Sequence, residues 1–358
     1  HLWITNNMAY STISKPSLYF NTRTYNGNGG TQSITGVGFQ PDMVWLKKRN
    51  GTANHHIVDA VRGVGYYIYP NLTNAEGGNG TSLITAFGTD GWTMNDGADS
   101  NASGATGVGW SWKAGTGAGS SNTDGSINTT STSVNTTAGF SISKYTGAGS
   151  NSTVGHGLGV APEVVWIKRL SNVDGMVVWH KSMGNDKHMK TDRNNGSSTG
   201  SNYFQDTAPS SSVVSIGSDT GVGDVGNTYV MYAFAEKKGY SKFGYYEGNG
   251  STNGKFIYTG FKPAFIMVKR TDSANNWTMY DNKRNTSFNE ITHTLIANSN
   301  DAEATSTSDD DCDFLSNGVK MRCTNNGSNG GGASYIYMAF AEEPLVANVG
   351  ASIPATAR

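Results

Sequence analysis

Two pairs of opposite charge occupy equivalent places in the sequence, and their chemistry suits a polar ligand. Asp59 with Arg62 and Asp281 with Arg284 share a three-residue spacing and the same distance from a preceding proline. Arginine presents a planar fork of N–H donors that matches carboxylates and phosphates. The same pairing is also expected of a structural salt bridge that ties a turn to a sheet, so both interpretations stay open.

A third equivalent place carries neither charge. It has His180 and Met183 where the other two places have aspartate and arginine. That part of the chain therefore cannot use the same ligand chemistry.

Clustered aromatic residues suggest a second kind of site. Tyr66, Tyr67 and Tyr69 lie close together, and Trp92 follows on a predicted hairpin. Flat apolar rings with a polar rim suit the stacking of sugar rings, which makes Tyr66, Tyr67 and Trp92 candidate ligand contacts. The alternative is that these rings belong to the core of an aromatic-rich fold.

Metal binding and catalysis find little support in the residue spacing. His55 and His56 lack a third partner at a zinc-like spacing, and the acidic run from Asp309 to Asp313 lacks the alternation of a calcium loop. The Gly-x-Gly pairs precede predicted strands rather than helices, and nothing pairs two carboxylates across a cleft. We therefore expect no enzyme activity, no catalytic residues, no cofactor and no metal.

These residues are positioned by a passage that occurs three times. Each copy has a Tyr-x-Gly-x-Gly turn, then a proline, then an apolar run that ends in basic residues; the copies start at Tyr25, Tyr145 and Tyr246, and the prolines are Pro41, Pro162 and Pro263. The period is about a hundred residues, the size of a small domain rather than a solenoid unit.

Each copy predicts two buried strands. The runs Met43–Leu46, Val164–Ile167 and Phe265–Val268 are apolar throughout, which is typical of a strand covered on both faces. The closing strands are Val108–Lys113, Tyr229–Glu236 and Tyr335–Glu342, and the last alternates Tyr and Ala with Ile, Met and Phe. The first and third copies also share a hairpin that the second lacks.

Composition favours strands joined by polar turns. Only 15% of the 358 residues are charged, 47 are glycine, and 11% are aromatic. We predict an all-β chain of three tandem antiparallel β-sandwich modules of jelly-roll or concanavalin-like type. Their bounds are an N-terminal arm at 1–16, modules at 17–115, 139–238 and 239–344, a flexible or extended linker at 116–138, and a tail at 345–358.

Net charge and hydropathy exclude two classes of partner. The net charge of −1 gives no basic stripe for nucleic acid, and no apolar run is long enough for membrane insertion. The seven residues before Met8 do not resemble a signal peptide, and Met8-Ala9-Tyr10 resembles a natural start. A processed precursor and an extended gene prediction are both open as the origin of those seven residues.

The cysteines flank one predicted turn. With Asn317-Gly318 as a two-residue loop, Cys312 lies opposite Cys323, and a disulfide is geometrically possible. The predicted site is a hydrogen-bonded pair, where Cα atoms lie about 5.5 Å apart and a disulfide is strained, so free thiols are the favoured alternative.

Three phrases carry a resemblance to a known group of proteins. They are Tyr145–Gly149, His156–Pro162 and Tyr335–Glu342, and the start at Met8–Pro16 agrees with them. From Met8 onward the chain resembles tail-fibre-like and other virion proteins of marine bacteriophages, which are built from concanavalin-like modules.

The resemblance implies a non-enzymatic protein on the virion surface that contacts or attaches to the host. Its partners would be further copies of itself, with a trimer favoured, other virion proteins, and host surface polysaccharide. A capsid decoration protein and a lectin-like carbohydrate-binding protein are the alternatives.

Overall fold

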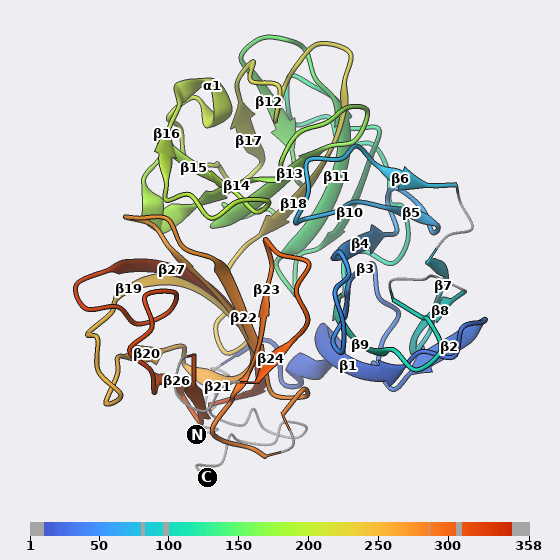
Figure 1. The fold of residues 1–358 in the computed structure, drawn as a ribbon. Coiled ribbons are helices and arrows are strands. Elements are labelled where there is room, and N and C mark those ends of the chain that lie inside the picture. Colours follow the sequence, from blue (N-terminus) through green and yellow to red (C-terminus); the bar gives the residue numbers. More distant parts are fainter. Residues whose placement is uncertain (1–10, 80–82, 96–99, 286, 306–309, 346–358) are drawn as a thin grey trace, which may run out of the picture.

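The computed structural model describes residues 11–79, 83–95, 100–285, 287–305 and 310–345. The protein is all-β, and its antiparallel sheets are grouped in three regions that surround a common centre (Figure 1). The N-terminal residues 1–10 and most of the predicted tail, 346–358, lie outside the described part. No helix in that part is long and apolar enough to cross a membrane.

The first region has a large sheet in the order β1-β9-β3-β4 and a small sheet in the order β2-β8-β7. Its elements are η1 (Pro16–Leu18), β1 (Phe20–Asn26), β2 (Gln32–Thr35), β3 (Met43–Lys48), β4 (His56–Asp59), β5 (Tyr66–Tyr67), β6 (Gly77–Gly78), β7 (Ile84–Gly88), β8 (Gly91–Met94) and β9 (Thr106–Trp112).

The second region has a large sheet in the order β10-β11-β18-β13-β14-β15-β16 and a small sheet of β12 and β17. Its elements are β10 (Ser131–Asn135), β11 (Phe140–Thr146), β12 (Ser152–Gly155), β13 (Val164–Arg169), β14 (Val177–His180), η2 (Lys181–Met183), β15 (Lys187–Lys190), β16 (Ser198–Thr199), α1 (Ser201–Phe204), β17 (Val213–Ile216) and β18 (Thr228–Phe234).

The third region has a large sheet in the order β19-β27-β21-β22-β23-β24 and a small sheet in the order β20-β26-β25. Its elements are β19 (Ser241–Glu247), β20 (Phe256–Tyr258), β21 (Phe261–Arg270), β22 (Trp277–Asp281), β23 (His293–Ile296), β24 (Ala304–Thr305), β25 (Cys312–Leu315), β26 (Gly318–Met321) and β27 (Ser334–Pro344).

The predicted buried strands are confirmed. β3, β13 and β21 each pair with the closing strand of their own region, β9, β18 and β27. Alternate residues of each strand serve two different cores. In β3, Val44 and Leu46 join the cluster between the two sheets of the first region, whereas Met43 and Trp45 face the centre of the molecule.

One apolar cluster occupies that centre and takes residues from all three regions. Ring contacts join the regions in pairs: Trp45 with Trp166 at 5.8 Å between centroids, Trp110 with Phe265 at 5.8 Å, and Phe234 with Phe340 at 6.2 Å. The regions therefore share one core and are not independent units, because each one buries its inner sheet face against the other two.

The seams between regions repeat the same polar contacts around the centre. The buried Lys47, Lys168 and Lys269, six residues after the three prolines, each donate to a main-chain carbonyl of a neighbouring region: Asn300 O at 3.4 Å, Leu72 O at 3.0 Å and Asn194 O at 3.1 Å. Main-chain N–H groups of Ala53, Asp174 and Asn275 donate at 2.7–2.8 Å to Asn300, Thr73 and Asn194. The first region thus docks on the third, the second on the first and the third on the second.

Residues 116–138, expected to form a flexible or extended linker, instead form part of the second region. β10 pairs with β11 along its whole length, and Ile127 forms a bridge with Val154 of β12. Serine and threonine hydroxyls in this segment accept and donate hydrogen bonds, as between Thr132 and Ser143. A polar, glycine-rich composition is thus compatible with an edge strand here.

The described part of the N-terminal arm also packs against the body. Ile13 is 1% exposed and belongs to the central cluster, and η1 lies against β27 of the third region. The arm therefore covers the seam between the first and third regions.

The predicted cysteine register is wrong, because the turn comprises Ser316 and Asn317 rather than Asn317 and Gly318. Leu315 pairs with Gly318, which places Cys312 opposite Met321. Cys312 and Cys323 are both buried and free. The first region has the same hairpin, since Gly88 pairs with Gly91 around Thr89 and Asp90.

Candidate functional site

The charged pair of the first region lies buried in a seam rather than at the surface. The Asp59 and Arg62 side chains are fully buried, with Arg62 Nε 2.5 Å from Asp59 Oδ2. The hydroxyl of Tyr232, in the closing strand of the second region, donates to the same carboxylate oxygen at 2.6 Å. Asp59 thus ties a turn of its own region to a strand of the next.

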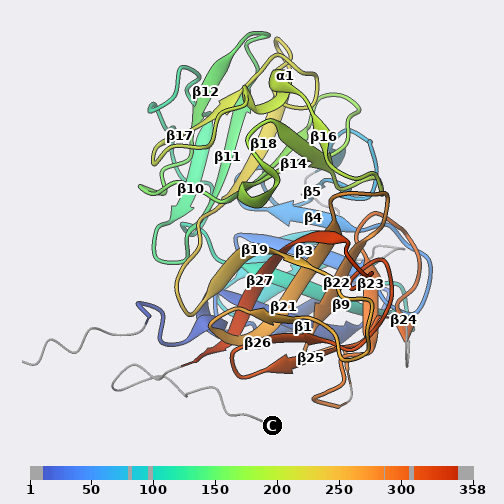
Figure 2. The same ribbon diagram turned by 90° about the vertical axis from the view of Figure 1, so that its left-hand side faces the viewer.

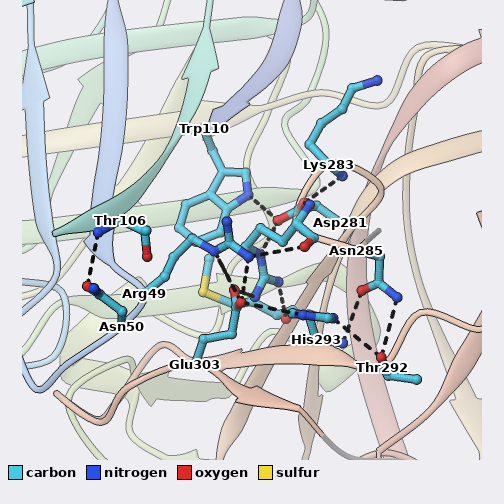
Figure 3. Close-up of polar contacts among 12 residues, drawn as sticks. Arg49, Asn50, Thr106, Trp110, Asp281, Lys283, Asn285, Thr292, His293 and Glu303 are labelled. Atoms are coloured by element: carbon cyan, nitrogen blue, oxygen red, sulfur yellow. Dashed lines mark hydrogen bonds and ion pairs between the residues drawn. The ribbon is translucent and has the colours of Figure 1, made fainter. Parts of the chain in front are cut away.

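The seam between the third and first regions repeats this arrangement (Figure 3). Arg284 Nε lies 2.6 Å from Asp281 Oδ2, and Trp110 Nε1 of the first region donates to that oxygen at 3.0 Å. Glu303 extends the network, because its carboxylate forms ion pairs with Arg284 at 2.8 Å and with Arg49 at 2.7 Å.

The remaining seam uses a neutral version. His180 Nδ1 accepts from the main-chain N–H of Ser182 at 3.1 Å, so Nε2 carries the proton and donates to Tyr337 O of the third region at 3.2 Å. The closing-strand residue that corresponds to Trp110 and Tyr232 is here Met338, which has no donor for a carboxylate. The second region thus has His180 and Met183 where the partner strand offers no side-chain donor to a carboxylate.

The protonation of these groups follows from burial and from their partners. Burial opposes the charge of Arg62, but the attraction of Asp59 and Glu76 outweighs it and raises the pKa. Burial alone would raise the pKa of Glu303, whereas its contacts with Arg49 and Arg284 leave it lowered. Burial lowers the pKa of His180 to about 4, so this imidazole is neutral at pH 7.

The geometry therefore favours the salt-bridge interpretation of Asp59, Arg62, Asp281 and Arg284. All four side chains are fully enclosed and satisfy one another, which leaves no face of these groups open to a ligand.

The predicted aromatic platform does not form. Trp92 is 1% exposed and belongs to the cluster between the sheets of the first region, and Tyr67 packs against the same cluster. Tyr67 also contacts His56 at 5.1 Å between centroids. Among the three predicted sugar-stacking residues, Tyr66 is the exposed one, with 37% of its surface accessible.

The paired histidines are engaged within the protein. His55 Nδ1 accepts from Trp45 Nε1 at 2.8 Å, and its Nε2 lies 3.0 Å from Ile296 O. Burial lowers the pKa of His56 to about 3. Within the described ranges, no three His, Cys, Asp or Glu side chains are grouped to hold a metal ion. Asp309 of the acidic run lies outside them.

A surface hollow that the sequence reasoning missed lies on the third region. Its volume is about 410 Å³, and it lies between β19 of the large sheet and β20 of the small sheet. Tyr245 is 69% exposed, Tyr258 54% and Phe256 39%, whereas Tyr246 and Ile257 beneath them are buried. Glu247 and Lys255 add one charge of each sign to the lining.

The sequence signal for this hollow is the alternation of side-chain direction along β19 and β20. Tyr245 and Tyr246 adjoin each other, and Ile257 separates Phe256 from Tyr258, so one face of each strand must carry its rings outward. The hollow is suited to a partner, since it combines exposed rings with the edge of a sheet.

Comparison with known proteins gives one result. No curated protein and no solved structure matches the chain. A family model described as a domain of unknown function (DUF7483) matches residues 15–344, which span all three regions. The chain therefore belongs to the DUF7483 family.

Proposed function

We propose that this protein is a non-enzymatic component of the surface of a bacteriophage particle, of the tail-fibre or spike kind, and that it contacts or attaches to the host. Each two-layered region is proposed to be a β-sandwich module of jelly-roll or concanavalin-like type. The phrases shared with virion proteins of marine bacteriophages motivate the assignment.

One observation supports it most: the repeated residues face inward and the differing parts face outward. The apolar strands and the buried lysines of the repeat lie in the central cluster and the seams. The copies differ on the outer side. The second region has β10 and lacks the hairpin that β7 and β8 form in the first region and β25 and β26 form in the third, and the third region exposes Tyr245 and Tyr258. A rigid frame that displays variable surfaces suits attachment.

The proposed partners are other virion proteins, further copies of this chain with a trimer favoured, and host surface polysaccharide. Ile13 of the arm is buried within the chain, so this side chain is not available for self-association. The alternative is that the protein decorates the capsid. A lectin-like role is a second candidate, favoured by the exposed ring of Tyr66.

The test combines location with adsorption. Antibodies against the recombinant protein should label intact particles at the tail in electron micrographs, and the free protein should compete with particles for host cells. Labelling of the capsid alone would replace the tail assignment by decoration. Absence of the protein from purified particles would refute the proposal.

A further inference from the structure

The hollow on the third region lies beside an open sheet edge. In the part of the chain that the structure describes, β19 pairs with β27 on one side and ends the sheet on the other (Figure 2). At the start of this edge Phe243 N–H donates to the Glu236 carboxylate at 3.4 Å, so the open part begins at Tyr245. Gly248 N–H donates to Ala333 O on the β27 side at 2.9 Å. Because main-chain groups alternate in direction along a strand, Tyr246 also faces β27, and the N–H and C=O of Tyr245 face outward.

The second region closes the same side with its own chain. β10 adds to β11 with Ser131 opposite Lys144. Farther along the segment, Ile127 N–H donates to Thr153 O at 3.0 Å, and Ile127 packs against the cluster between the two sheets. We call residues 119–135 the strap, since they connect the large sheet to the small one.

The repeat places the hollow where the strap would lie. Tyr145 pairs with Tyr229 and Tyr246 with Tyr335 in the same register, so Lys144 corresponds to Tyr245. By the same repeat, Val154, which is bridged to Ile127, corresponds to Ile257 in the lining of the hollow. The third region has no strap because β18 ends at Phe234 and β19 begins at Ser241.

We propose that this hollow is an acceptor site for an extended strand of a partner polypeptide. The strand adds to the outer edge of β19 and places an aliphatic residue beside Ile257 of β20, as Ile127 lies beside Val154 of β12 in a parallel bridge. The rings of Tyr245 and Tyr258 flank it. This proposal goes beyond the proposed function, since it rests on the internal repeat and holds wherever the protein resides.

The strap also defines the chemistry of the partner. A Cβ atom on Gly125 would lie 2.4 Å from Thr153 O of β12. A partner strand that approaches as closely needs a small residue there, followed by a hydroxyl and an aliphatic side chain, as Ser126 and Ile127 supply in the strap. The opposite charges of Glu247 and Lys255 suit a strand of low charge, such as the strap, in which Asp124 is the one charged residue.

The experiment uses the full chain and a fluorescein-labelled synthetic peptide of residues 119–135, with a scrambled peptide as control. The decisive pair of variants is Tyr245→Val and Tyr245→Pro. Both remove the ring, but only proline removes the outward N–H, and proline is tolerated on the open edge of a strand. Circular dichroism and the melting temperature confirm that both variants are folded.

We expect saturable anisotropy with the strap peptide and none with the scrambled one. Affinity should fall by less than about threefold in Tyr245→Val and by tenfold or more in Tyr245→Pro, because the proline deletes a main-chain hydrogen bond. Hydrogen exchange should slow at Tyr245 and Glu247 and at residues 256–258 when the peptide binds, whereas Ser241 and Phe243 already donate to Lys237 O and Glu236.

Three results would overturn the proposal. The first is no saturation up to about 1 mM peptide, and the second is equal affinity in both variants. The third is that glucose- or galactose-based oligosaccharides bind instead and lose affinity equally in both variants, which would assign the rings to a sugar.

Discussion

Replacement of Arg62 by methionine is the sharpest test of the buried seam pairs, because methionine is the natural residue at the equivalent Met183. In the first region the change leaves the Asp59 carboxylate fully buried beside Tyr232 with no cation. At roughly 4 Å between charge centres and an effective dielectric constant of about 20, the lost attraction is about 4 kcal/mol. Measured losses of one partner from buried pairs are about 3–5 kcal/mol.

The assay is urea unfolding followed by tryptophan fluorescence, since Trp45, Trp110 and Trp166 lie in the central cluster. Arg62→Met should lower the free energy of unfolding by about 3–5 kcal/mol. Adding Asp59→Asn should recover about 2 kcal/mol or more, because the unpaired charge is removed. Arg270→Met, which breaks the partly exposed pair with Asp272, should cost less than about 1 kcal/mol. A loss for Arg62→Met as small as this control, or no recovery in the double variant, would refute the reasoning.

Three further predictions concern the core, the histidines and the strap. Phe340 contacts rings from all three regions, so Phe340→Ala should lower the free energy of unfolding by about 3–5 kcal/mol. Calorimetry should still show one transition, and separate transitions would contradict a shared core. Burial lowers the pKa of His56 to about 3 and of His180 to about 4, so the stability they provide is intact above pH 6.5 and falls by about 1.4 kcal/mol per pH unit for each as the pH drops toward 4. Urea unfolding at pH 7, 6 and 5 measures this, and a His180→Gln variant with an unchanged slope would exclude that residue. Gly119→Ala should loosen the strap, because Gly119 has a φ of 74° and no room for a Cβ; hydrogen exchange at β10 and β11 should quicken, and unchanged exchange would mean that the strap is not held there.

The sequence was sufficient to predict the strands of the sheets but not their assembly. An apolar strand such as Met43–Leu46 has the same sequence pattern whether its second face packs against another layer of its own module or against a neighbouring region. The lysine that follows it, Lys47, was the missed signal, because a buried ammonium group needs carbonyl partners. One of these partners, Lys48 O, is local, and the other, Asn300 O, belongs to another region.

The candidate site was less predictable for local reasons. The Asn-Gly preference of hairpins pointed to a turn at Asn317-Gly318, but the packing of Phe314 and Val319 into the third region's cluster accompanies a turn one residue earlier. The burial of Asp59 depends on Tyr232, which lies far away in sequence. The exposure of Tyr245 depends on β19 being an edge, and only the sheet order reveals that.

The seam between the first and third regions has a consequence for synthesis of the chain. Arg49 and Glu303 are 254 residues apart, so their contact cannot form until nearly all of the chain has left the ribosome. Until then, Trp110 of the first region lacks its contact with Phe265 of the third. Nascent and prematurely terminated chains should therefore expose apolar surface that binds chaperones and is sensitive to proteases, and this surface is buried once the third region has been made.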